Sequence, residues 1–253
     1  MLSVVKPISK REFSDMVYRY HYSKVMPKLT KIYLGGFDGD ELVAVMSLGW
    51  GVRPLHTIRK LFPSLGTKDY LEIGKMCLPD SQPKNSESRF ISLCLKYLKK
   101  EVPGLKLVFT WADGMLGKPG YIYQASNFYY GGFAETDSYF SGKGEKVHPR
   151  TTGAIGGRPS IEKQKEIGFS HYKGRQFRYV YFLCSKKEEK SLLDESDFTW
   201  SKSNNPKDCD LKWRKRGEDG WADSPPPNYD PYQASFRNAE VLSVSREQQA
   251  LSL

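Results

Sequence analysis

Apolar positions recur with either strand or helix periodicity through most of the chain up to about residue 185. Ser9 and Glu12 have the spacing of a capping box, and apolar residues at helical spacing follow them. Asp38-Gly39-Asp40 separates two β-rich runs and predicts a hairpin turn. Asn85 is placed to cap a second helix, which Pro103-Gly104 ends. The predicted elements are a helix at 9–20, strands at 31–37, 41–50 and 70–78, a helix at 86–101, a strand at 105–112, a helix at 119–130 and a strand at 177–184.

This order of elements is typical of a mixed α/β fold, in which helices flank a central twisted sheet. Beyond residue 185 the character of the chain changes, because the segment is charged and contains Ser224-Pro225-Pro226-Pro227. We therefore predict a folded domain at 1–185 and a weakly structured extension at 186–253 that can wrap around it.

The chain of 253 residues has a formal net charge of +10, and this charge is unevenly distributed. Residues 1–185 hold 28 Lys and Arg against 16 Asp and Glu, whereas the extension holds 11 against 13. A basic folded body is typical of proteins that bind a phosphate backbone, although a merely basic surface is an open alternative. The cluster Lys212-Trp213-Arg214-Lys215-Arg216 could touch nucleic acid, but a solvated charge run is the favoured interpretation.

Several classes of protein are not expected. The chain has no run of about 18 apolar residues, so a membrane span is not predicted. The N-terminal residues hold no signal-peptide core, and the four cysteines include no C-x-x-C pair. We therefore expect a reduced, cytoplasmic protein.

The end of the first predicted helix carries a dense set of proton carriers. Tyr20-His21-Tyr22-Ser23-Lys24 places an imidazole, phenols, a hydroxyl and an amine at one helix–loop junction. The alternative is that His21 and its tyrosine neighbours pack against the hairpin.

The strand at 71–78 leads into Pro83-Lys84-Asn85-Ser86-Glu87-Ser88-Arg89. The amides at a helix N-terminus, together with Asn85, Ser86 and Ser88, are suited to binding an anion or a carbonyl group. Ordinary helix capping would need only one of these side chains and is the alternative.

Asp113 follows a buried strand, and a glycine-rich turn and a helix follow it. This is the usual location of a site in an open α/β sheet. Asp113 could accept protons from an exocyclic amine, and Tyr123 could donate to a leaving group. The alternative is that Asp113 caps a turn and the tyrosines belong to the core.

Four ordered motifs carry a family resemblance: YHYSK, LEIGKMCLPD followed by PKNSESRFI, WADG with GKPGYIYQASNFYYGG, and VHPR before the strand FRYVYFL. Over residues 8–184 the chain resembles the bacteriophage Mom family. These DNA-modification proteins place a carbamoylmethyl (acetamido) group on adenine N6 and are similar to GNAT acyltransferases in predicted fold. The resemblance implies a GNAT-like catalytic domain at 1–185, double-stranded DNA as partner, protection of that DNA from restriction, and the cytoplasm of the host cell as location.

The resemblance also implies a set of site residues. Lys75 stands where an arginine is expected in the family. Trp111, beside the site, is a candidate for stacking on an extruded base. The residues matched to the motifs are His21, Tyr22, Lys75, Asn85, Ser88, Asp113, Tyr123, Ser126, Asn127, His148 and Arg150.

The roles expected of these residues follow from the chemistry of adenine. Asp113 orients and polarises the N6 amine, and His21 or Tyr22 takes its proton. Tyr123 protonates the leaving group of the donor, while Asn85 and Ser88 bind the transferred carbonyl or its carrier. Because no Q/R-x-x-G-x-G/A loop follows the strand at 71–78, the donor stays open between acetyl-CoA and another glycine- or acetyl-derived compound.

Three other interpretations stay open at this point. One is a conventional GNAT acyltransferase that uses acyl-CoA to modify a small amine, a protein or a tRNA. Another is a non-catalytic DNA-binding anti-restriction module. In the third, His21, Asp113 and His148 form a two-His-one-carboxylate iron site.

Overall fold

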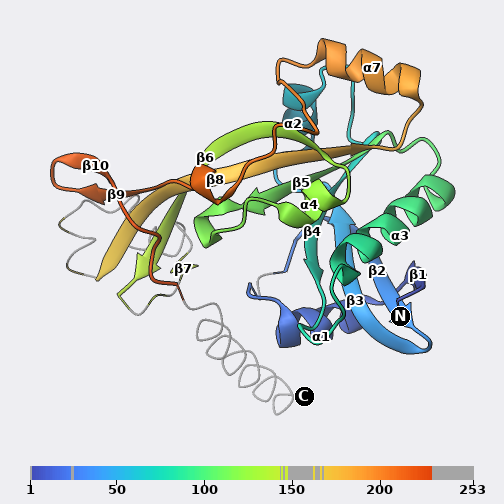
Figure 1. Cartoon of the computed structure of the whole chain (residues 1–253), viewed down its shortest axis with the longest axis horizontal. Helices are drawn as coiled ribbons and strands as arrows, with labels where there is room; N and C mark the ends of the chain where they lie inside the picture. The colour runs from blue at the N-terminus through green and yellow to red at the C-terminus, as the bar shows by residue number, and fades with distance from the viewer. Residues whose placement is uncertain are drawn as a thin grey trace, which may run out of the picture.

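The computed structural model describes residues 2–23, 26–142, 144, 146–147, 162, 166 and 168–229. The predicted mixed α/β class is confirmed, because helices flank one central, mostly antiparallel sheet (Figure 1). Its elements are β1 (Val4–Pro7), α1 (Lys10–Tyr20), β2 (Thr30–Asp38), β3 (Glu41–Gly49), α2 (Pro54–Leu61), β4 (Tyr70–Cys77), α3 (Ser86–Glu101), β5 (Leu107–Asp113), η1 (Gly114–Leu116), α4 (Tyr121–Ala125), β6 (Tyr129–Ser141), β7 (Lys146–Val147), β8 (Phe169–Phe182), α7 (Lys186–Glu195), η2 (Asp208–Asp210), β9 (Trp213–Gly217) and β10 (Gly220–Asp223).

The strand order along the sheet is β1-β2-β3-β4-β5-β8-β6-β7. Among the strand pairings of the described residues, only that of β4 with β5 is parallel, and α3 is the crossover helix between them. These two strands pair over three residues, Tyr70 with Leu107 to Glu72 with Phe109, and their pairing then ends. The parallel pair therefore opens into a fork toward its carboxyl ends, and the fork positions the site.

Core side chains alternate between the two faces of the sheet, as the period of a strand requires. On one face Val108 and Tyr179 pack under α3 and α4. On the other face the neighbouring residues Phe109 and Val180 pack under α2 and α7, while α1 covers a separate cluster around Val45.

The extension at 186–253 was predicted to be weakly structured, and this is wrong for residues 186–223. Ser185 and Glu188 form a capping box that starts α7, a signal present in the sequence. Strands β9 and β10 form a hairpin at the end of the sheet farthest from β1 (Figure 1). There β9 pairs with Tyr172–Gly174 of β8, next to the stretch of β8 that β5 occupies. The domain boundary at residue 185 stays a prediction.

The helix predicted at 119–130 is shorter than expected, and part of that segment is strand. Helix α4 ends at Ala125, Asn127 adopts a left-handed φ of 60°, and β6 begins at Tyr129. The pair Gly131-Gly132, expected to end the helix, lies at an irregularity within β6. A Cβ atom on Gly131 would approach the Trp200 ring to 2.2 Å, so this backbone needs glycine.

Candidate functional site

One cavity lies in the fork between β4 and β5. This fork cavity has a volume of about 430 Å³ and receives side chains from α1, β4, β5 and α4. His21 and Tyr22 follow α1, whereas Asp113 ends β5 and Tyr123 belongs to α4. The lining residues are Tyr20, His21, Tyr22, Ile73, Gly74, Lys75, Met76, Cys77, Leu78, Asp80, Glu87, Trp111, Ala112, Asp113, Gly117, Lys118, Pro119, Gly120, Tyr121, Ile122 and Tyr123.

Asp113 is held by the turn that follows it. Its Oδ1 accepts a hydrogen bond of 3.1 Å from the Met115 backbone N–H, so it caps η1 as well as lining the cavity. Its Oδ2 lies 3.4 Å from the Lys146 ammonium nitrogen. The Met115 carbonyl accepts a 3.1 Å hydrogen bond from the indole N–H of Trp213, the first residue of β9. The hairpin of the extension is thus connected to the carboxylate through one turn of chain.

Two of the tyrosines that line the fork cavity, Tyr22 and Tyr123, are neutral phenols at ordinary pH. Burial raises the pKa of Tyr123, whose hydroxyl accepts a 3.2 Å hydrogen bond from Thr110 Oγ1. Burial and then the negative charge of Asp113 raise the pKa of Tyr22 well above its usual range. Both side chains are therefore suited to donating a proton rather than to accepting one.

His21 and Lys75 meet at the α1 side of the fork cavity. The imidazole of His21 is buried and stacks on Tyr22, with ring centroids 4.3 Å apart. Its Nδ1 lies 2.9 Å from the backbone N–H donor of Ser23 and 3.5 Å from the Lys75 ammonium. The Lys75 ammonium also donates a 2.9 Å hydrogen bond to the Ser23 carbonyl. Through this hydrogen bond Lys75, on β4, stabilises the position of the segment that follows α1.

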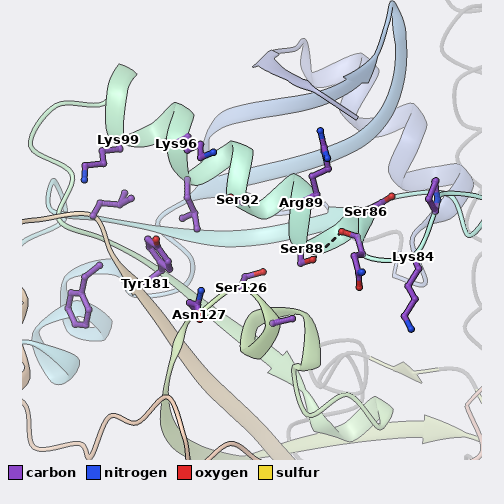
Figure 2. Close-up of a pocket in the computed structure, with 16 residues that line it drawn as sticks. Lys84, Ser86, Ser88, Arg89, Ser92, Lys96, Lys99, Ser126, Asn127 and Tyr181 are labelled. Atoms are coloured by element: carbon purple, nitrogen blue, oxygen red, sulfur yellow. Dashed lines mark hydrogen bonds between the residues drawn. The ribbon is translucent and has the colours of Figure 1, made fainter. Parts of the chain in front are cut away.

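The second cavity lies between α3 and α4, and Figure 2 shows the side chains that line it. This helix cavity has a volume of about 590 Å³. One stripe of α3, at helical spacing, supplies most of its polar groups. The lining residues are Pro83, Lys84, Asn85, Ser86, Ser88, Arg89, Ser92, Leu95, Lys96, Lys99, Ala125, Ser126, Asn127, Tyr181, Phe182 and Leu183.

The predicted side-chain cap of α3 is wrong in its detail. Asn85 occupies the capping position with a left-handed φ of 69°, but its side chain makes no capping hydrogen bond. Instead Ser88 Oγ donates a 3.1 Å hydrogen bond to the Asn85 carbonyl. The Asn85 amide is therefore available to the helix cavity, which its side chain lines.

The residues predicted from the sequence divide between the two cavities. The fork cavity brings together Asp113, Tyr123, Tyr22, His21, Lys75 and Trp111. The helix cavity brings together Asn85, Ser88, Ser126 and Asn127. Arg150 and His148 lie outside the described residues.

Sequence reasoning missed several cations. Lys118 lies over the Tyr22 ring, 4.3 Å from its centroid, and lines the fork cavity. Lys96 and Lys99 line the helix cavity, and their spacing from Ser92 on α3 was the signal that could have identified them. Within the described ranges no group of three or more His, Cys, Asp and Glu side chains could hold a metal ion, so the predicted iron site, which needs His148, stays a prediction. Nor does any described helix have the length and apolar character needed to cross a membrane.

Comparison with solved structures gives matches among acetyltransferases. An N-acetyltransferase from Staphylococcus aureus Mu50 matches 72% of this chain and 98% of its own, with 14% identity and a TM-score of 0.40. An aminoglycoside 6'-acetyltransferase type Ii matches 73% of this chain and 99% of its own, with 13% identity and a TM-score of 0.40.

Comparison of sequences gives a more specific result, and it confirms the resemblance noted above. The methylcarbamoylase Mom of Escherichia phage Mu is 35% identical over 176 residues, which cover 68% of this chain and 71% of that protein. The family model described as the Mom protein family matches residues 3–199. β9 and β10 lie beyond that match. The chain therefore belongs to the Mom protein family.

Proposed function

We propose that this chain is a transferase that places a carbamoylmethyl group on the N6 amine of adenine in phage DNA and so protects that DNA from restriction. The observation that carries this proposal is the fork cavity, where a carboxylate, an imidazole and two neutral phenols from three separate segments face one space. Membership of the Mom family supports it.

The acceptor enters the fork cavity as an extruded base. The N6 lone pair of adenine is delocalised into the ring and N6 is paired in duplex DNA, so the base must leave the stack before it reacts. Trp111 lines the cavity from β5 and offers a stacking surface. Asp113, two residues farther along the same strand face, accepts a hydrogen bond from the N6 amine and increases its nucleophilicity.

The protonation states of the side chains in the fork cavity assign the remaining catalytic roles. A bond forms between N6 and the methylene carbon of the donor, whose leaving group departs with the electron pair. Tyr123 is a neutral phenol and donates its proton to that leaving group. Either His21 or Tyr22 was expected to take the proton from N6. Because Tyr22 is a neutral phenol it does not accept this proton, and we assign the role to His21.

The donor occupies the helix cavity on a phosphorylated carrier. Lys84, Lys96 and Lys99 supply positive charge there, and the N-terminus of the 16-residue helix α3 adds its partial charge. Coenzyme A and other phosphorylated carriers have this chemistry, provided that the methylene carbon of the glycine- or acetyl-derived group bears the bond that breaks. Asn85 and Ser88, which line this cavity, then bind the carrier.

The test is nucleoside mass spectrometry on plasmid DNA from bacteria that express the protein. We expect a deoxyadenosine derivative with the added acetamido mass from the unaltered chain and none from Asp113→Asn. Asp40→Asn, at the exposed β2–β3 turn, is the matched control and keeps the modification. Modification that persists in soluble Asp113→Asn would refute the assigned role of Asp113.

The same experiment separates the rival functions. A conventional acyltransferase would bind acyl-CoA without leaving a new deoxyadenosine derivative in DNA, and the cationic helix cavity is the feature that favours it. A non-catalytic anti-restriction module would protect DNA equally well with Asp113→Asn as without it.

A further inference from the structure

The hydroxyl of Tyr22 has no protein partner in the fork cavity. Tyr22 lines this cavity and is partly buried. Within the part of the chain that the structure describes, no hydrogen bond is made by its hydroxyl. The proton from N6 goes to His21, so the transfer itself does not use this phenol. A partly buried donor without a partner is unfavourable unless water or a ligand accepts its hydrogen bond.

Packing fixes the orientation of the Tyr22 ring. The His21 imidazole stacks on this ring and the Lys118 ammonium lies over it, each 4.3 Å from its centroid. His21 is itself held by the Ser23 backbone N–H, which lies 2.9 Å from Nδ1. These contacts occupy ring surface on which a base would stack. The hydroxyl is therefore the group that Tyr22 offers to a ligand.

The turn that follows Asp113 brings this ring close to the carboxylate. The Lys118 backbone N–H donates a 3.1 Å hydrogen bond to the Asp113 carbonyl. The carbonyl of the next residue, Pro119, accepts a hydrogen bond from the Tyr179 hydroxyl, so the turn is fixed at two successive residues. One short turn thus begins with the carboxylate of Asp113 and covers Tyr22 with an ammonium, and the two residues lie beside each other.

The electrostatics of Tyr22 agree with this position. Burial raises the pKa of Tyr22 most, and the negative charge of Asp113 and then the nearby Tyr123 raise it further. A phenol with a raised pKa keeps its proton at neutral pH and acts as a hydrogen-bond donor. The cavity therefore presents a donor close to the Asp113 carboxylate.

Together Asp113 and Tyr22 form an acceptor–donor pair. Asp113 Oδ2 lies 3.4 Å from the Lys146 ammonium, but a carboxylate oxygen has two lone pairs and can accept a second hydrogen bond. Adenine presents an amine donor, N6, beside a ring acceptor, N1, which matches this pair. Cytosine presents the same pattern on a smaller ring, whereas guanine and thymine present a carbonyl oxygen beside an N–H group. The pair is therefore suited to bases that carry an exocyclic amine.

The way in which an extruded base enters the cavity favours N1 over N7. The base stays attached to its sugar at N9, so the six-membered ring with N1 and N6 enters first, and N7 lies nearer the sugar. Among the residues that line the cavity, Tyr20 and Tyr121 are exposed, whereas His21 and Tyr123 are buried. Tyr22 stacks on His21 and lies near Tyr123, so it belongs to the inner end of the cavity. Its hydroxyl is accordingly placed to meet N1.

We propose that the Tyr22 hydroxyl donates a hydrogen bond to N1 of the extruded adenine while Asp113 accepts one from N6, and that this pair selects the base. The proposal rests on the proposed function, because it names how the same cavity recognises its acceptor. Tyr22 is then a binding residue that determines specificity, and it transfers no proton.

Competitive binding to a duplex library tests this proposal without any group donor. Each duplex has random flanking sequence and an unpaired position, opposite an abasic site, that holds deoxyadenosine, 1-deazadeoxyadenosine or 7-deazadeoxyadenosine. The abasic site removes the base pair, so differences in pairing strength do not contribute. Excess fully paired duplex occupies chain that binds DNA without extruding a base. The purified full chain is captured, and the bound duplexes are counted by sequencing a barcode that identifies the base.

We expect the unaltered chain to bind 1-deazadeoxyadenosine about fivefold less than the other two bases, because a C–H group in place of N1 cannot accept the hydrogen bond. Tyr22→Phe should bind all three bases equally. Tyr129→Phe removes a phenol hydroxyl outside the fork cavity and is the matched control, so it should keep the preference of the unaltered chain. A purely structural role of Tyr22 would instead weaken binding of all three bases by one factor and leave their ratios unchanged.

Three results would overturn the proposal: equal binding of all three bases by the unaltered chain, a preference that persists in Tyr22→Phe, or selective loss of the 7-deaza base, which would assign the contact to N7. Nucleoside mass spectrometry on plasmid DNA reports separately on the proposed function. Modified DNA from a chain without the N1 preference would refute the role of Tyr22 alone. An N1 preference that depends on Tyr22 in a chain that leaves DNA unmodified would refute the transfer chemistry and retain the recognition of the base.

Discussion

Replacing Tyr123 by phenylalanine removes one hydroxyl from the fork cavity and leaves the ring in place. The ring is buried and packs against Phe128 and Tyr179, with centroids 5.5 and 5.4 Å away. These contacts persist in Tyr123→Phe. The change therefore isolates the proton that we assign to leaving-group protonation.

The structure separates the effects of Tyr123→Phe on stability and on catalysis. The folded state loses one neutral hydrogen bond, from Thr110, which contributes about 1 kcal/mol. For a domain of this size that lowers the melting temperature by about 2–4 °C. The loss of a positioned general acid reduces the rate about 10²- to 10⁴-fold. Activity should therefore fall far more than the folded population does.

Tyr129→Phe is the matched control for this experiment. The Tyr129 hydroxyl donates a 2.7 Å hydrogen bond to Glu189, and bonds to charged groups contribute about 1.5–3 kcal/mol. Because Tyr129 does not line the fork cavity, we expect this variant to be the less stable of the two and the more active. Thermal melting and quantitative nucleoside mass spectrometry measure both properties. If Tyr123→Phe keeps more than a tenth of wild-type activity, Tyr123 is not the acid.

Three further predictions concern stability and donor binding. Burial raises the pKa of Glu72 from 4.5 to about 7, so the folded state keeps a proton that the unfolded chain releases, and stability falls by about 3 kcal/mol as the pH rises through this interval. Urea unfolding should show this fall in the unaltered chain but not in Glu72→Gln, and an equal fall in both would contradict the assignment. Lys96→Gln combined with Lys99→Gln should weaken coenzyme A binding at least tenfold by calorimetry while duplex DNA affinity stays within twofold; unchanged coenzyme A affinity would remove the carrier from the helix cavity. Gly131→Ala should lower stability by about 1–3 kcal/mol, because the added methyl group overlaps the Trp200 ring, and a melting temperature equal to that of the unaltered chain would disprove that contact.

The sequence predicted the site best where candidate functional residues stand at the ends of helices and strands. Asp113 and Tyr123 flank one glycine-rich turn, so their proximity followed from local patterns. The separation of Asn85 and Ser88 from Asp113 into another cavity could not be predicted, because it depends on where β4 and β5 stop pairing. The residue at which the two strands stop pairing depends on the twist of the sheet and on the sequences of both strands, so it cannot be predicted from either strand alone.

The elements that the sequence analysis missed have physical explanations as well. Helix α2 has eight residues and begins with Pro54 after a strained Arg53, so it gives a weak periodic signal. Strand β8 begins at Phe169 and is 14 residues long, but only its apolar second half was recognised. Hairpin β9–β10 appeared as a charge run, because its stability comes from pairing with β8 rather than from its own apolar residues.

The contact between Trp213 and the Met115 carbonyl has a consequence for how members of this family are compared. The family match ends at residue 199, yet the indole that holds the turn after Asp113 lies 14 residues beyond it. An alignment restricted to the shared region therefore contains the Asp113 carboxylate without a residue that supports its turn. Relatives with different C-terminal segments must hold the turn after the equivalent carboxylate by other means, and exchanging these segments between relatives would change the position of that carboxylate without altering any residue of the shared region.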